Sequence, residues 1–337
     1  MKLGLIARHD NSGLGSLSLE FARHLKPTKV LLVSNGVYQT FPERYADFDT
    51  RRIPAREEMT RADIDWLFDG TDVILSFETF YDLGFVWKAH RASKKTALVT
   101  MCEMQHEKVQ ANHMPDLLIC PSSLDMELYE QHFPSVPKVS IAPPIATDRL
   151  VWKQRRTATH FVHTSSHGGL RGRKGTSIII EAMKQVKADI KLTIYSWKPI
   201  VCADPRVEVK VQNFRNYWQC WQEGDVLVYP QGANGISLPC QEAFASGLAV
   251  VTTDQRPFNE WLPKRPLFAP IGWTKARMGK DLIVVDEPII DPTVLAAKID
   301  EIAGIDITAE SEAGRRWAEA NSWDALLPKY LEALNSL

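Results

Sequence analysis

Residues 229–251 read YPQGANGISLPCQEAFASGLAVV, and this stretch decides the fold class. A strand ends near Tyr229, a loop of small residues follows, and Pro239 stands where it can open a helix. Glu242 falls in the expected first turn of that helix, and Val250 returns the chain to an apolar strand. This order predicts two parallel strands joined by a helix. The Glu242 carboxylate either complements the helix dipole or binds a ligand near the helix start.

The same alternation of strands and helices is expected on both sides of this stretch. Short apolar runs bounded by turn residues alternate with segments of helical spacing, which is typical of a parallel sheet covered on both faces. The helices expected in the second half are Thr176–Val186, Phe214–Gln222, Pro239–Ser246 and Pro292–Ile302. The expected strands are Leu3–Ala7, Val30–Ser34, Val73–Phe77, Ala97–Met101, Leu117–Cys120, Val139–Ala142, Phe161–Thr164, Ile190–Tyr195, Val207–Val211, Val226–Tyr229, Val250–Thr253 and Leu282–Val285.

A break at Pro143-Pro144 separates two such halves, and 337 residues are enough for two domains. We therefore predict an α/β protein of two tandem Rossmann-like, doubly wound domains, with a cleft between them at the carboxyl ends of both sheets. The first domain is expected at 1–148, together with a C-terminal crossing helix at about 309–337. The second domain is expected at 157–308.

Composition narrows the class of protein. The 40 Lys and Arg residues nearly balance 41 Asp and Glu, so a uniformly basic nucleic-acid binder is disfavoured. Five cysteines without a C-x-x-C pair argue against a disulfide framework and for a reducing compartment. The start of the chain lacks the features of a secretory signal, and no run approaches about 18 apolar residues. We expect a cytoplasmic protein without a membrane span.

Two glycine-containing turns are candidate anion sites. Gly13 and Gly15 follow the first strand and precede a helix, where they either receive a ligand or only permit a tight turn. In the second half, Arg171, Arg173 and Lys174 lie among glycines ahead of a helix and suit a diphosphate. These three belong to the stretch 149–180, which holds seven Lys or Arg and no Asp or Glu. A solvated charge run is the alternative for this stretch.

Together these motifs resemble the GT-B-fold, nucleotide-sugar-dependent glycosyltransferases. The similarity is to the large retaining family that contains sucrose synthases and bacterial mannosyltransferases. Its signature is matched by Gly235-Ile236-Ser237-Leu238-Pro239 and by the run from Glu242 to Val251. The glycine turn at Gly13, the Lys174-Gly175 pair, Glu260 and the closing segment Ser322-Trp323-Asp324 follow in family order. The opening Arg8-x-Asp10 with Glu20-Phe21 also looks like a subgroup from phage and actinobacterial genomes.

The resemblance implies roles for the donor side. Glu242 should bind the ribose hydroxyls, and Lys174 with Arg171 or Arg173 should hold the diphosphate of a nucleotide sugar such as a UDP-sugar. Backbone N–H groups of Gly235, Ile236, Ser237 and Leu238, together with the turn at Gly13 and Gly15, should complete the donor site. Asn234 stands where the family has a glutamate and can hydrogen-bond a sugar hydroxyl. The same cations make a metal ion and any further cofactor unnecessary.

The acceptor side is less defined. Cys102-Glu103 stands where the family has a histidine, and Glu103 either deprotonates the acceptor hydroxyl or caps the next helix. The phage-like opening suggests a hydroxymethylated base in DNA as the acceptor, whereas a polysaccharide, a lipid or a protein fits equally. A sugar-nucleotide epimerase and a non-catalytic nucleotide-sugar binding protein are the other classes considered.

Metal-binding alternatives are weaker. Asp47-Phe48-Asp49 and Asp63-Ile64-Asp65 resemble metal-binding pairs, but their surroundings favour solvated surface. His160, His163 and His167 lack a nearby carboxylate or cysteine, so we expect core or loop histidines rather than zinc ligands. Four tryptophans of the second half, Trp197, Trp218, Trp221 and Trp273, are candidates for core packing or for stacking on the donor base.

Overall fold

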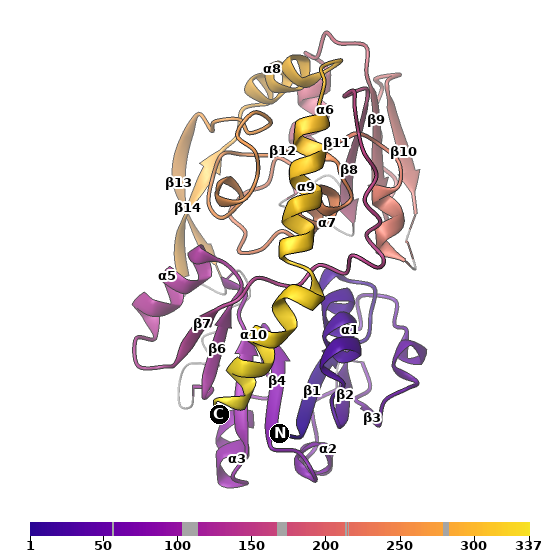
Figure 1. Cartoon of the computed structure of the whole chain (residues 1–337). Helices are drawn as coiled ribbons and strands as arrows, with labels where there is room; N and C mark the ends of the chain where they lie inside the picture. The colour runs from indigo at the N-terminus through magenta and orange to yellow at the C-terminus, as the bar shows by residue number, and fades with distance from the viewer. Residues whose placement is uncertain (56, 103–113, 167–173, 213, 215, 279–282) are drawn as a thin grey trace. The chain divides into compact units, whose positions relative to one another are not determined.

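The computed structural model describes residues 1–337 except 56, 103–113, 167–173, 213, 215 and 279–282 (Figure 1). The chain divides into two units, each built around its own parallel sheet. The first unit comprises Met1–Pro144, Arg277–Val284 and Trp323–Leu337, and the second comprises Ile145–Ala276 and Val285–Ser322. The predicted α/β class with two parallel sheets is confirmed.

The sheet of the first unit has seven parallel strands in the order β3-β2-β1-β4-β5-β6-β7. The chain fills β1 to β3 in one direction and then resumes at β4 on the other side of β1. All five side chains of β4 are buried, as a continuous apolar run requires. The strands are β1 (Leu3–Arg8), β2 (Lys29–Val33), β3 (Thr50–Arg52), β4 (Val73–Phe77), β5 (Lys95–Val99), β6 (Leu117–Cys120) and β7 (Lys138–Ser140).

Helix α1 (Gly13–Leu25) begins at the carboxyl end of β1. The Ser12 hydroxyl caps it by accepting the Gly15 N–H at 3.1 Å. A Cβ at Gly15 would lie 1.9 Å from the Asp10 carbonyl oxygen, so this turn requires glycine. Helix α1 lies beside α10 (Trp323–Asn335) (Figure 1). On α1, Phe21 packs edge-on against Trp323 and Tyr330 of α10. The other helices of the unit are η1 (Pro42–Tyr45), α2 (Arg61–Phe68), α3 (Phe85–Arg91) and α5 (Ser123–His132).

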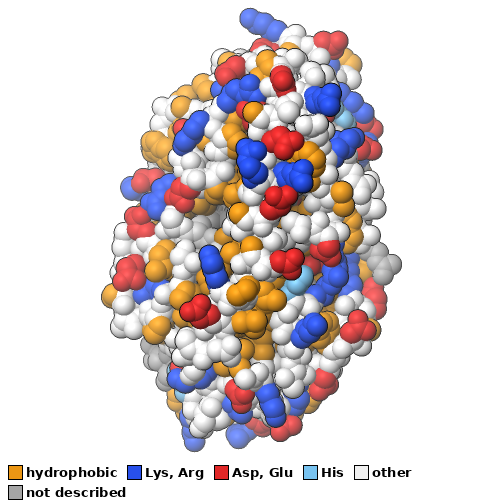
Figure 2. Space-filling model, viewed as in Figure 1, with side chains coloured by type: hydrophobic (Ala, Val, Ile, Leu, Met, Phe, Trp, Pro, Cys, Tyr) orange, Lys and Arg blue, Asp and Glu red, His pale blue; other side chains and the backbone are white. Residues whose placement is uncertain are grey.

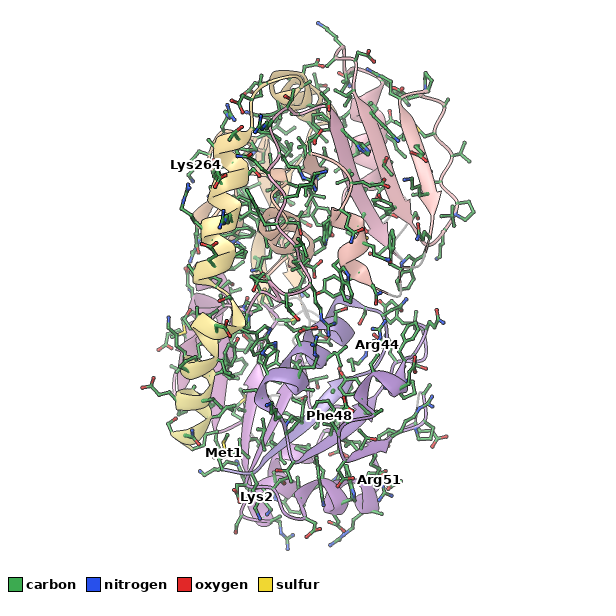
Figure 3. All side chains as sticks on the ribbon, turned by 45° about the vertical axis from the view of Figure 1, so that its right-hand side comes forward. Met1, Lys2, Arg44, Phe48, Arg51 and Lys264 are labelled. Carbon is green, nitrogen blue, oxygen red and sulfur yellow. The ribbon has the colours of Figure 1, made fainter. Side chains whose placement is uncertain are left out.

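One of the two Asp-x-Asp pairs has a structural role. Asp63 completes a capping box with Thr60 at the start of α2 and pairs with Arg51 of β3, which is labelled in Figure 3. Its side chain is buried, so the prediction of solvated surface is wrong for Asp63. The prediction is confirmed for Asp47, Asp49 and Asp65, which are exposed.

The sheet of the second unit has five parallel strands in the order β10-β9-β8-β11-β12. Successive residues of its central strand enter different cores, because Phe161 packs with Ile179 and Leu295 whereas Val162 packs with Phe244. This alternation covers both faces with helices, as a doubly wound sheet needs. The strands are β8 (His160–Ser166), β9 (Lys191–Ser196), β10 (Val207–Val211), β11 (Val226–Val228) and β12 (Ala249–Val251).

Within the described residues of the second unit, four α-helices cover this sheet. Helix α8 packs on α6, and α9 packs on α7 (Figure 1). Gly314 lets α9 pack closely on α7, since a Cβ at this position would lie 2.1 Å from the Phe244 carbonyl oxygen. The helices are α6 (Thr176–Met183), α7 (Leu238–Ala245), α8 (Pro292–Ile302) and α9 (Thr308–Ala320), with 3-10 turns η4 (Tyr217–Trp221) and η5 (Phe258–Glu260).

Three predicted elements differ from the structure. The expected helix Phe214–Gln222 is the short 3-10 turn η4, whose end is held by Arg155 donating to the carbonyls of Trp221 and Gln222. The expected strand Leu282–Val285 belongs to β14 (Ile283–Ile289), which lies outside the parallel sheet and joins β13 (Gly272–Met278). Neither β13 nor the short edge strand β3 was predicted.

The expected crossing helix at about 309–337 is two helices. They are separated at Asn321, whose side chain donates back to the Trp317 carbonyl while its own carbonyl accepts the Ile145 N–H. Helix α9 belongs to the second unit and α10 to the first, whereas the whole segment was expected in the first.

Charge is dispersed over the face of the molecule that Figure 2 draws. Figure 2 shows Lys and Arg side chains next to Asp and Glu over the face that it draws, as a net charge of −1 would suggest. Within the described part of the chain, no helix is both long and apolar enough to cross a membrane.

Candidate functional site

The second sheet changes direction between β8 and β11, and two loops follow these strands at their carboxyl ends. Ligands of open parallel sheets bind at such a point, because the loops on either side lead away from each other. The loop after β8 ends at Lys174-Gly175, and the loop after β11 runs over 229–237. Lys174 and the loop that carries Asn234 therefore lie at one edge of one sheet.

Gly175 brings the two loops together. Its φ is +74°, and a Cβ there would lie 2.0 Å from the Pro230 carbonyl oxygen. Only glycine allows this approach at the start of α6. The preceding residue, Lys174, donates from its ammonium to the Ser166 hydroxyl at 2.6 Å, so the cation stays at the end of β8.

The buried His163 side chain holds this turn in place by hydrogen bonds. Its Nδ1 lies 2.9 Å from the Val228 carbonyl oxygen, and its Nε2 lies 2.9 Å from the Thr176 hydroxyl. Burial lowers the pKa of His163 to about 3, so the ring is neutral and joins β8, β11 and α6 as a structural group.

His163 is a core histidine, as predicted, and His160 is half-buried on β8. His160 lies 2.8 Å from the Thr193 hydroxyl, and His167 is outside the described residues. Among the residues that the structure describes, no group of three or more His, Cys, Asp or Glu side chains could hold a metal ion.

The loop after β11 is closed by its own side chains. Asn234 Oδ1 accepts the N–H groups of Ile236 at 3.1 Å and of Ser237 at 2.9 Å. Gln231, which is 2 % exposed, accepts from the Asn234 amide and donates to the Ser237 hydroxyl at 2.8 Å. Two of the backbone N–H groups expected to hold sugar or phosphate are thus engaged within the loop. Ser237 adopts a left-handed φ of 51° as α7 begins.

A second glutamine holds the base of this loop. Gln255 donates from its side-chain amide to the carbonyls of Gln231 and Gly232, each at 3.1 Å. Gln255 is buried, so both bonds are shielded from water. The conformation of the loop after β11 is therefore fixed by its own hydrogen bonds.

Glu242 lies in the second turn of α7, not the first as predicted, because the helix already begins at Leu238. A role as partner of the helix dipole is weakened by this position, since that effect fades within the first turn. The carboxyl group is half-buried and accepts the Trp221 indole N–H at 3.1 Å. Burial raises the pKa of Glu242 to about 8, against the opposing effects of Trp221 and the Lys174 charge.

The remaining predicted residues are distributed as follows. Gly13 and Gly15 lie at the start of α1 in the first unit. Gly235 and Leu238 flank the two engaged amides in the loop after β11 and at the start of α7. Arg171, Arg173 and Glu103 lie outside the described residues.

Sequence reasoning missed three residues that shape the site. Ser166, Gln231 and Trp221 contact Lys174, Asn234 and Glu242, respectively. Trp221 was one of four unsorted tryptophans, and no periodicity links it to a residue 21 positions away. Of the others, Trp218 lies beneath the Arg149 guanidinium at 5.0 Å, and Trp273 is exposed.

Comparison with known proteins agrees with this geometry. Residues 163–271 match the model of the family described as Glycosyl transferases group 1. The matched segment is less than half of the chain, and it contains Lys174, the loop after β11 and Glu242. Among the curated proteins, none matches the sequence.

Solved structures resemble the whole chain. HepE of Anabaena in complex with UDP and glucose has a TM-score of 0.71 at 12% identity, with 100% of each chain covered. A glycosyltransferase of Rickettsia africae has a TM-score of 0.69 at 13% identity, covering 99% of this chain and 98% of that one. Sucrose-phosphate synthase of Thermosynechococcus elongatus gives 0.64 at 14% identity, covering 100% and 98%. At these identities the likeness establishes the fold alone.

The chain therefore has the GT-B fold and carries a domain that matches group 1 of the glycosyl transferases. This match lies within the second unit.

Proposed function

We propose that the protein transfers a sugar from a nucleotide diphosphate donor, such as a UDP-sugar, to an acceptor hydroxyl, with the donor bound by the second unit. The observation that carries this proposal is the combination of Lys174 and Glu242 at the switch point between β8 and β11. The two groups are close enough for the Lys174 charge to lower the pKa of Glu242. A cation suits the diphosphate of such a donor, and a carboxyl group suits its ribose. HepE, which shares the fold, was solved with UDP and glucose.

The diphosphate is assigned to Lys174. An ammonium group fixed beside the β-phosphate stabilises the charge that grows on the leaving nucleoside diphosphate. Arg171 and Arg173, which precede Lys174 in the sequence, are proposed to add to this charge. The Leu238 N–H at the first position of α7 is the proposed backbone donor, since the Ile236 and Ser237 amides bind Asn234.

The ribose is assigned to Glu242. An ionised carboxylate accepts two hydroxyl hydrogen bonds, whereas a protonated carboxyl group has less accepting capacity. Because the pKa of Glu242 is about 8 without a ligand, donor binding at neutral pH should release a proton. Asn234 donates one amide hydrogen to Gln231, and its second is proposed to meet a sugar hydroxyl.

Retention of the anomeric configuration and independence from a metal ion are parts of the proposal that rest on the resemblance to the retaining family. In that mechanism the leaving phosphate oxygen takes the proton of the incoming hydroxyl on the same face of the sugar. Glu103, Gly13 and Gly15 keep their proposed roles toward the acceptor and the donor.

A polysaccharide, a lipid or a protein is favoured as acceptor over a hydroxymethylated base in DNA. A DNA acceptor would need the cations of 149–174 on an exposed face. Lys153 and Arg156 are exposed, but Arg155 is 5 % exposed and donates to two carbonyl groups of the chain, so this cation does not face a DNA backbone. Transfer of labelled sugar to hydroxymethylated DNA, with salt-dependent binding of that DNA, would reverse this preference.

Replacement of Lys174 by alanine tests the proposal. Loss of one charged group that stabilises a leaving group should lower the turnover of donor hydrolysis or transfer by about 10²-fold or more. Lys184→Ala on the same helix region is the matched control, because Lys184 pairs only with Glu181 in the described contacts. Turnover by Lys174→Ala equal to that of the control would remove the diphosphate assignment.

The products separate the alternative classes. Slow hydrolysis of a nucleotide sugar marks a transferase, formation of an epimer marks an epimerase, and binding without conversion marks a binding protein. A thermal-shift screen over uridine, guanosine and adenosine diphosphate sugars finds the donor, because a ligand of the folded state raises the unfolding midpoint.

A further inference from the structure

Trp221 is a buried side chain with a single hydrogen-bond donor. It ends the 3-10 turn η4, is 3 % exposed, and donates its Nε1–H to Glu242 Oε2 at 3.1 Å. An indole can donate but not accept, so this contact specifies which oxygen of the carboxyl group faces the ring. Among the residues that the structure describes, no donor hydrogen-bonds the other oxygen, Oε1, so this oxygen is the one that a ligand could meet.

The position of the indole is fixed from both sides. Trp221 belongs to the hydrophobic core that contains Phe244 of α7 and Val162 of β8. On its backbone side, the buried Arg155 guanidinium donates to the Trp221 carbonyl at 3.1 Å. Because packing and the Arg155 hydrogen bond hold the indole in place, rotation of the Glu242 carboxyl group would break the hydrogen bond to Trp221. The hydrogen bond therefore restricts the orientation of the carboxyl group.

The titratable groups around Glu242 lie on three segments of the chain. Lys174 precedes α6 and favours the carboxylate, whereas Cys220 of η4 and Cys240 of α7 are buried thiols with raised pKa values. Both thiols are therefore neutral at physiological pH. The ionic state of Glu242 is thus decided by burial, the Lys174 charge and the Trp221 N–H.

We propose that Trp221 is a positioning residue that presents the Glu242 carboxylate to the two ribose hydroxyls, so that the site selects ribonucleotide over dideoxyribonucleotide diphosphates. This inference rests on the proposed function, because it requires that Glu242 binds the ribose. The inference extends the proposed function by one residue, Trp221, which acts through Glu242 and does not itself contact the donor. It also extends it by a preference for the ribose hydroxyls.

The test compares the wild-type protein and one variant, each with three pairs of ligands. Trp221→Phe retains the aromatic packing and removes the N–H. The ligands are UDP, GDP and ADP, each measured by calorimetry against its 2′,3′-dideoxy analogue. We expect wild-type protein to prefer the ribonucleotide, and Trp221→Phe to bind it about tenfold more weakly while binding the dideoxy analogue unchanged.

Trp317→Phe is the matched control. Trp317 packs against Phe244 on the same helix as Glu242, with ring centroids 5.8 Å apart, and among the described contacts it has no hydrogen bond to Glu242. This variant makes the same chemical change in the same core. It should bind both ligands as the wild-type protein does.

The pH dependence supplies a second readout. Binding that needs the carboxylate weakens as the pH falls below the pKa of free Glu242, which is about 8. Removal of the indole N–H should raise that pKa, so the midpoint of the UDP-minus-dideoxy-UDP profile should move to higher pH. Trp317→Phe should leave the midpoint unchanged.

Each result decides a different statement. Equal weakening of both ligands by Trp221→Phe, or no weakening of either, would overturn the positioning role while leaving the proposed function intact. A wild-type protein that binds UDP and its dideoxy analogue equally would remove the ribose assignment of Glu242, and the positioning role with it. A wild-type protein that binds none of the three nucleotides would contradict the proposed function itself.

Discussion

At the scale of single residues, His163 makes stability depend on pH. Its pKa is about 3 in the folded protein and about 6.5 when exposed, so between these values the unfolded chain binds more protons. Stability should therefore fall as the pH decreases below about 6.5, and the loss should continue down to about pH 3. Each pH unit within this window costs up to about 1.4 kcal/mol.

Replacement of His163 by glutamine should remove this contribution. Between pH 7 and pH 5, the wild-type free energy of unfolding should fall by about 2 kcal/mol more than that of the variant, as measured by urea unfolding. His132→Gln is the control, because His132 is exposed and should retain the wild-type dependence. An identical pH dependence in His163→Gln and wild type would contradict the buried, neutral ring.

At the scale of elements, the contact between α7 and α9 depends on Gly314. Alanine is favoured over glycine within a helix by about 1 kcal/mol, so Gly314→Ala would stabilise an isolated α9. In the protein the new methyl group would lie 2.1 Å from the Phe244 carbonyl oxygen, which forces the two helices apart. We expect the clash to prevail and the unfolding midpoint to fall.

Thermal unfolding of Gly314→Ala measures the balance. Arg316→Ala, two positions further on the exposed side of α9, introduces the same residue without the clash and should leave the midpoint nearly unchanged. A midpoint for Gly314→Ala at or above that of wild type would show that α9 tolerates a wider separation from α7.

At the scale of the whole molecule, the last helix completes the unit that the chain began with. In α10, Trp323 stacks on His24 with ring centroids 4.2 Å apart, and the Tyr330 hydroxyl donates to the Ala142 carbonyl at 3.1 Å. Deletion of residues 323–337 should therefore expose Phe21 and loosen the first unit. Hydrogen exchange should accelerate in β1 and α1 and remain unchanged in β8 and β11.

The same experiment has a clear opposite outcome. Acceleration confined to β8 and β11 would assign α10 to the second unit, and no acceleration anywhere would show that α10 contributes no packing. A full-length Glu332→Ala variant, altered at an exposed position of α10, is the control and should exchange as wild type does.

The sequence by itself determined the strands and the donor motif. Buried strands such as Val73–Phe77 and Leu117–Cys120 appear at their predicted bounds, because a run of apolar residues between turn residues is a local signal. The motif from Gly235 to Val251 indicated the fold class for the same reason, since loop chemistry and the helix start are read from neighbouring residues. The 3-10 turn η4 was misjudged as a helix because Arg155, some 60 residues earlier in the chain, holds its end.

Only the tertiary structure decided which of these residues meet. Gly175 approaches Pro230, and Trp221 reaches Glu242, through the order in which β8 and β11 pair in the sheet. Asn234 binds its own loop because the turn folds back on it. Likewise, the packing of α10 on Phe21 assigns the end of the chain to the first unit. Contacts of this kind arise from packing between segments that are distant in the sequence, so a local pattern of residues does not predict them.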